Sequence, residues 1–72
     1  MSKLRTFYDV LQLLKRFGIF IYTRDRSSDL QLIEKEMNEL HTWGMVDTET
    51  FQSAILIIRR ELAQLSDKEK KE

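Results

Sequence analysis

Residues 43–65 read WGMVDTETFQSAILIIRRELAQL. Asp47 is a residue type that commonly caps the start of a helix, and Val46 and Phe51 have the spacing of a hydrophobic staple around such a start. Beyond Asp47, apolar residues recur at intervals of three and four, the period of an α-helix with one buried face. The pattern predicts a helix over about residues 48–65, with an apolar stripe made of Phe51, Ala54, Ile55, Ile58, Leu62 and Leu65.

The segment before Gly44 predicts a second helix that opens at Ser28 and ends at Trp43 and Gly44. The Ser28 hydroxyl can accept from the amide of Gln31 while the Gln31 side chain reaches back, which is a capping box. Glycine favours the left-handed conformation that ends many helices. Because only a short turn separates the two helices, we expect an antiparallel helical hairpin. The apolar stripe of the second helix is Leu30, Ile33, Met37 and Leu40.

The N-terminal segment predicts a further helix over about residues 6–17, with Thr6 and Asp9 at capping positions and Gly18 after its end. Three amphipathic helices joined by short connections, without any proline, predict an all-α fold, a three-helix bundle. We expect one domain over residues 1–65 and a charged, frayed tail over residues 66–72. The stripe of the first helix is Phe7, Val10, Leu11, Leu14 and Phe17.

The connection between the first two helices lies within KRFGIFIYTRDR, residues 15–26. It resembles the strand of RNA-recognition modules whose aromatic side chains stack on bases, but those modules need a four-stranded sheet and the rest of this chain is typical of helices. We therefore expect Ile19–Thr23 to be extended or irregular. Side chains alternate in an extended chain, so Ile19 and Ile21 would share one side while Phe20 and Tyr22 share the other.

Positive charge gathers in this part of the chain. Residues 1–26 hold six basic and two acidic side chains, a local charge of +4, although the whole chain has a net charge of +0. Cations attract phosphates, and bases stack on aromatic rings. One hypothesis is therefore a site for single-stranded DNA or RNA; the alternative is that the aromatic rings are core and that the arginines pair with Asp25 or Asp29. The candidate nucleic-acid-binding residues are Lys15, Arg16, Phe20, Tyr22, Arg24 and Arg26.

A second hypothesis, of a different class, is protein–protein interaction or homo-oligomerisation. Several large apolar residues lie off the main stripes, and an exposed apolar patch commonly marks an interface. The helix over residues 6–17 could cover Ile57 without a partner, so both interpretations stay open for that residue. The candidate interface residues are Leu32, Trp43, Leu56 and Ile57.

Several function classes are disfavoured by composition. The chain has no cysteine and one histidine, which excludes disulfides and thiolate or multi-histidine metal sites. His41 is expected to be a hydrogen-bonded boundary residue, because no serine or cysteine is placed to use it as a base. With no phosphate-binding glycine loop either, we expect no enzymatic activity and no cofactor. The lack of cysteine fits a reducing, cytoplasmic setting, which we therefore expect. No apolar run is long enough for a signal peptide or a membrane span, so a soluble protein is expected.

Two long segments carry a family resemblance: FYDVLQLLKRFGIFIYTRDR and EKEMNELHTWGMVDTETFQSAILIIRREL. Together they resemble the YqgQ-like family of short proteins from Gram-positive bacteria, over about residues 6–65. The resemblance implies a compact three-helix bundle without established enzymatic activity and with a suspected role in binding single-stranded DNA or RNA. It assigns no role to any residue, so the candidate sites rest on charge and aromatic spacing alone.

Overall fold

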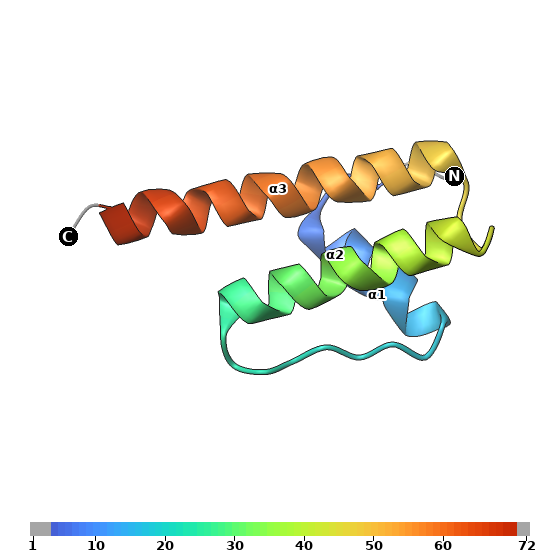
Figure 1. Cartoon of the computed structure of the whole chain (residues 1–72), viewed down its shortest axis with the longest axis horizontal. Helices are drawn as coiled ribbons and strands as arrows, with labels where there is room; N and C mark the ends of the chain where they lie inside the picture. Colours follow the sequence, from blue (N-terminus) through green and yellow to red (C-terminus); the bar gives the residue numbers. More distant parts are fainter. Residues whose placement is uncertain (1–3, 71–72) are drawn as a thin grey trace.

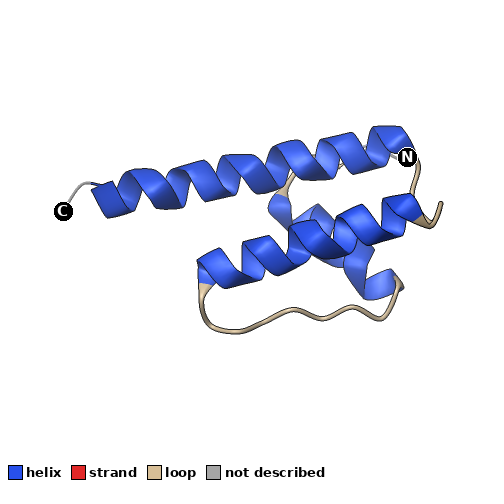
Figure 2. Cartoon of the chain, in the orientation of Figure 1, coloured by secondary structure: helices blue, strands red, loops and turns tan. Residues whose placement is uncertain are grey.

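The computed structural model describes the backbone of residues 4–70 and the side chains of residues 4–65. It contains three helices, α1 (Phe7–Arg16), α2 (Arg26–Thr42) and α3 (Thr48–Lys70). Helices α2 and α3 form an antiparallel hairpin, α1 lies across it, and the chain between α1 and α2 returns along α2 (Figure 1). Figure 2 shows helices and loops without a strand over residues 4–70. The predicted all-α three-helix bundle is confirmed.

Helix α1 begins and ends as predicted. Thr6 is its N-cap, and the Thr6 hydroxyl accepts a hydrogen bond from the Asp9 amide at 3.2 Å. The Asp9 carboxylate in return accepts from the amides of Arg5 (3.0 Å) and Thr6 (3.2 Å), and these bonds hold the pKa of Asp9 below its ordinary value. The helix ends before Gly18, whose φ of +75° is the left-handed conformation expected there.

Helix α2 begins earlier than predicted, with its N-cap at Asp25 instead of Ser28, three residues further on, and the expected capping box of Ser28 and Gln31 is wrong. Its first turn starts at Arg26, with Asp25 at the N-cap position and the Asp29 amide donating to the Asp25 carbonyl at 2.8 Å. The Ser28 hydroxyl instead donates to the Asp25 carboxylate at 2.8 Å. Ser28 therefore lies inside the helix, because the Asp25 carbonyl accepts the first helical hydrogen bond.

The hairpin turn and the start of α3 agree with prediction. Helix α2 ends at Thr42, and Gly44 follows with a φ of +76°. At the start of α3 the Asp47 carbonyl accepts from the Phe51 amide at 2.9 Å, which places Asp47 at the N-cap position.

Helix α3 continues to Lys70, beyond the predicted end at residue 65. The side chains of residues 66–70 and the whole of residues 71–72 lie outside the described part of the chain. The frayed charged tail over residues 66–72 therefore stays a prediction.

The core lies where the three helices meet, and every predicted stripe contributes to it. Ile57, which the second hypothesis placed on an exposed surface, is only 7% exposed and belongs to this core. The reason is tertiary. Helix α3 packs against both α2 and α1, so more of its surface is covered than α2 alone would cover. The buried apolar residues are Val10, Leu14, Leu30, Ile33, Met37, Leu40, Val46, Ala54, Ile57 and Ile58.

Candidate nucleic-acid interface

Residues 17–25, which we call the connecting loop, are tied down at both ends. At the α1 end the Ile19 amide donates to the Leu14 carbonyl at 3.0 Å. At the α2 end the amide and the hydroxyl of Thr23 both donate to one carboxylate oxygen of Asp29, each at 2.7 Å. This contact was not predicted from the sequence, where its only local signal is an acidic residue in the first turn of the helix that follows.

Between these two ties the side chains alternate, as predicted. Ile19 and Ile21 are half-buried and pack against the core. Phe20 and Tyr22 are 73% and 81% exposed. The connecting loop thus keeps one apolar side for the protein and presents two aromatic rings on the other.

The two rings border an open groove of about 280 Å³. Lys15, from the last turn of α1, lines the same groove, so the fold brings Lys15, Phe20 and Tyr22 together. The remaining lining residues are apolar and come from α1 and the connecting loop: Leu11, Leu14, Ile19 and Ile21.

Arg24 stands at the far end of the connecting loop, two residues after Tyr22. Its φ of 73° is left-handed, which costs a residue with a side chain about 1–2 kcal/mol. Among residues 4–65 neither Arg24 nor Lys15 has an ion-pair partner. The expected alternative of pairing with Asp25 or Asp29 is not found, since Asp25 accepts from Ser28 and Asp29 accepts from Thr23.

Arg26 has partners of its own within the bundle. Its guanidinium lies 4.7 Å from the centre of the Phe7 ring and 3.2 Å from a Glu61 carboxylate oxygen on α3. A cation that is paired and stacked in this way is less available to a phosphate than Lys15 or Arg24.

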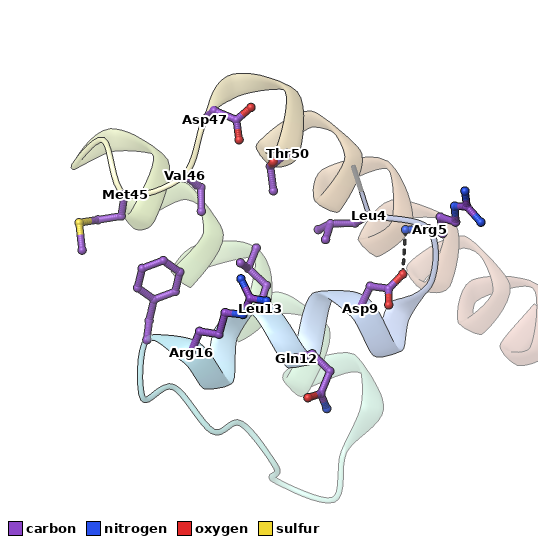
Figure 3. Close-up of a pocket in the computed structure, with 11 residues that line it drawn as sticks. Leu4, Arg5, Asp9, Gln12, Leu13, Arg16, Met45, Val46, Asp47 and Thr50 are labelled. Atoms are coloured by element: carbon purple, nitrogen blue, oxygen red, sulfur yellow. Dashed lines mark hydrogen bonds between the residues drawn. The ribbon is translucent and has the colours of Figure 1, made fainter. Parts of the chain in front are cut away.

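Arg16 points away from the groove, into a cleft of about 510 Å³ between α1 and the turn that joins α2 to α3 (Figure 3). Leu13 and Val46 line this cleft, and Asp9 and Asp47 stand at its edge (Figure 3). The predicted basic patch is therefore divided by the fold. Lys3, which contributes to the charge of residues 1–26, lies outside the described residues.

The second predicted surface is exposed except at Ile57. Trp43 is 74% exposed, Leu56 is 66% exposed and Leu32 is 41% exposed. Leu56 lines a groove between α2 and α3, bordered by an ion pair of Glu34 and Arg59 at 3.8 Å, whereas Trp43 and Leu32 do not line it. Among residues 4–65, the groove that Leu56 lines therefore does not bring the three exposed candidates together.

His41 is a boundary residue, as expected. Its Nε2 lies 3.2 Å from the Thr48 hydroxyl, and its ring stacks on Phe51 with centroids 4.2 Å apart and planes 7° from parallel. These contacts join the end of α2 to the start of α3.

The described residues hold neither a membrane-spanning helix nor a cluster of metal-ligand side chains. No helix over residues 4–70 is long and apolar enough to cross a membrane. Among the side chains of residues 4–65, no three histidine, aspartate or glutamate side chains come together as metal ligands would.

Comparison with known proteins agrees with the resemblance noted from the sequence. The model of the YqgQ-like family matches residues 4–64. A relative from Bacillus subtilis (strain 168), named uncharacterized protein YqgQ, is 39% identical over 61 residues, which cover 85% of this chain and 86% of the relative. The chain therefore belongs to the YqgQ-like family.

Proposed function

We propose that this protein is a small, non-enzymatic module that binds single-stranded DNA or RNA through the connecting loop. Phe20 and Tyr22 stack on bases, and Lys15 and Arg24 contact phosphates. The observation that supports this most is the alternation of the loop, in which two aromatic rings are 73% and 81% exposed beside a groove. Stacking of a base on such a ring contributes about 1–3 kcal/mol.

The two ties of the connecting loop also favour binding. When a loop must become ordered on binding, the entropy that it loses reduces the favourable free energy of binding. Here Thr23 is held by Asp29 and Ile19 is held by Leu14 before any ligand arrives. The aromatic rings are therefore presented from a chain whose two ends do not need to move.

The number of basic residues near the groove sets how strongly binding should depend on salt. In this proposal Lys15, beside the groove, and Arg24 make two phosphate contacts, and Arg16 adds a third from the neighbouring cleft. Each contact to a single strand changes the slope of log affinity against log salt by about −0.7. Raising the salt from about 50 to about 200 mM should then weaken binding roughly 7- to 20-fold.

Fluorescence anisotropy of labelled single-stranded DNA and RNA oligonucleotides, measured at both salt concentrations, tests this proposal. Lys15→Ala combined with Arg24→Ala should weaken binding at low salt and flatten its salt dependence. The matched control is Lys35→Ala combined with Arg60→Ala, which removes the same charge from exposed positions outside the groove. Equal losses in the two double variants, or no binding of either nucleic acid at low salt, would contradict the proposed interface.

A second candidate function is protein–protein interaction or self-association, favoured by the exposure of Trp43 and Leu56. Met45, which the sequence analysis did not single out, is 54% exposed and stands two residues from Trp43 in the hairpin turn. An apolar interface of this kind should persist as salt rises, unlike phosphate contacts. Sedimentation equilibrium at high protein concentration should then show a dimer that Trp43→Ser with Leu56→Ser dissociates. A monomer at every concentration would exclude self-association.

A further inference from the structure

We infer that the connecting loop takes one unpaired base at a time, inserted between the rings of Phe20 and Tyr22. This inference rests on the proposed function and specifies it further. The recognised unit is then a single unstacked base, and not a run of stacked nucleotides.

The spacing of the two rings is the first argument. An extended chain rises about 3.3 Å per residue, so side chains two residues apart on one side are separated by about 6.6 Å. Successive bases along a strand are about 3.4 Å apart. A base held between two rings needs about twice that distance, which matches the spacing that an extended chain gives to the Cα atoms of Phe20 and Tyr22. Two stacked bases would not fit in the same gap.

The groove supplies the second argument. Its volume of about 280 Å³ is small, and besides the two rings and Lys15 it is lined by the apolar residues Leu11, Leu14, Ile19 and Ile21. A base offers two apolar faces to the rings. A longer stack of nucleotides would leave most of its faces outside the groove.

The backbone of the loop supplies the third argument. Within the described part of the chain, the main-chain groups of residues 20–22 form no hydrogen bond, whereas the amides of Ile19 and Thr23 on either side do. Backbone N–H and C=O groups are strong donors and acceptors that seek partners. The polar edge of a base held between Phe20 and Tyr22 would meet these groups.

The same geometry excludes a duplex. A paired base is stacked on both faces and has its pairing edge occupied, so it cannot enter between two rings without first leaving the helix. Lys15, which lines the groove, and Arg24, two residues after Tyr22 in the chain, would then contact the phosphates on either side of the inserted base. We expect single strands to bind and duplexes of the same length to bind much more weakly.

The test uses eight-nucleotide strands that are abasic throughout, that carry one central adenine, or that carry two adjacent central adenines. Binding of the full chain to each strand is measured by fluorescence anisotropy at low salt. One adenine should strengthen binding about 10- to 100-fold over the abasic strand, as a stacked base does. A second adenine should add only the roughly twofold gain that a second equivalent position gives.

Substitution of the rings provides an independent readout. Because a base held between two rings needs both, Phe20→Leu and Tyr22→Leu should each remove most of the gain from the adenine, and the double variant should lose little more. Both side chains are exposed, so the fold should tolerate these changes. The matched control is Tyr8→Leu, an aromatic ring that is 67% exposed and does not line the groove.

Failure of this inference is distinguishable from failure of the proposed function. Equal affinity for the abasic and one-adenine strands, with salt dependence retained, would overturn base insertion and leave binding through phosphates. A second adenine that adds another tenfold gain, or additive losses in the two ring variants, would show that each ring stacks on its own base. If no strand binds at low salt, both the inference and the proposed function are wrong.

Discussion

The hairpin of α2 and α3 and the connecting loop use apolar residues in opposite ways. In the hairpin the apolar stripes face inward, and residues such as Met37 and Ile58 are fully buried. In the connecting loop four apolar residues follow one another, Ile19 to Tyr22, and every second one faces solvent. A continuous apolar run normally indicates a strand that is buried on both faces. Here no sheet covers the outer face within residues 4–70, which leaves that face available to a ligand.

The two regions also differ in what holds them in place. The hairpin is stabilised by the close packing of its core, whereas the connecting loop is held by hydrogen bonds at its ends and by two half-buried isoleucines. This difference predicts that substitutions in the hairpin change the stability of the whole protein. Substitutions on the outer side of the loop should change binding and leave stability nearly unchanged.

The largest expected effect is that of Ile58→Ala. Ile58 is fully buried, so its truncation removes apolar contacts and leaves a cavity, which costs about 2–5 kcal/mol of unfolding free energy. Leu56→Ala on the same helix, at a side chain that is 66% exposed, should stay within about 0.5 kcal/mol of the wild type. Urea unfolding followed by circular dichroism measures both values.

This difference between the two regions would be contradicted if a substitution on the outer side of the loop destabilised the protein as much as Ile58→Ala does. Tyr22→Ala, at a side chain that is 81% exposed, is the variant to set beside it. A loss of more than about 2 kcal/mol in Tyr22→Ala would mean that the ring is packed in solution.

A smaller effect is expected from Asp29→Ala, which removes the acceptor for both hydrogen bonds of Thr23. The loss of these exposed bonds should cost about 1 kcal/mol, and the Thr23 amide should exchange its hydrogen faster than in the wild type. Glu36→Ala, at an acidic residue in the middle of the same helix, is the control. Unchanged exchange at Thr23 in Asp29→Ala would show that the loop is held by its isoleucines alone.

The smallest effect is expected at the start of α1 and depends on pH. The pKa of Asp9 is lowered in the folded state by hydrogen bonds from the amides of Arg5 and Thr6. Its contribution to stability is therefore present above its ordinary pKa of 3.8 and is lost as the pH falls through the lower folded value. Asp9→Asn should be less stable than the wild type at neutral pH, and the difference should shrink as the pH falls below 3.8.

Thermal unfolding of both proteins across this pH range measures that difference. Asp47→Asn is the control, because within residues 4–65 the Asp47 carboxylate accepts no hydrogen bond from a backbone amide. A constant difference between wild type and Asp9→Asn at every pH would contradict the role assigned to the ionised carboxylate.

Local patterns were enough to predict most of the fold and failed where two local signals competed. The capping pair of Thr6 and Asp9 forms as expected because nothing else near the start of α1 competes for it. At the start of α2, Ser28 has the correct spacing for a cap, but the Asp25 carbonyl accepts the first helical bond and Asp29 is engaged by Thr23. Sequence spacing alone does not rank such overlapping options.

In the candidate site, too, local patterns predicted some features and failed to predict others. Exposure of Phe20 and Tyr22 followed from alternation along an extended chain, which is a local property. The sorting of the basic residues did not follow from position: Lys15 lines the groove, its neighbour Arg16 points into another cleft, and Arg26 pairs with Glu61. Adjacent residues on a helix point about 100° apart, so membership of a basic run does not place their charges together.

The sequence by itself therefore determined the helices, their inward faces and the two-sided character of the connecting loop, because periodicity and capping act between residues that are close along the chain. Only the tertiary structure decided that Ile57 is core and that Arg26 pairs with Glu61. Both outcomes depend on where distant segments pack. Burial and charge pairing are properties of the assembled bundle, and no local pattern in a single sequence specifies them.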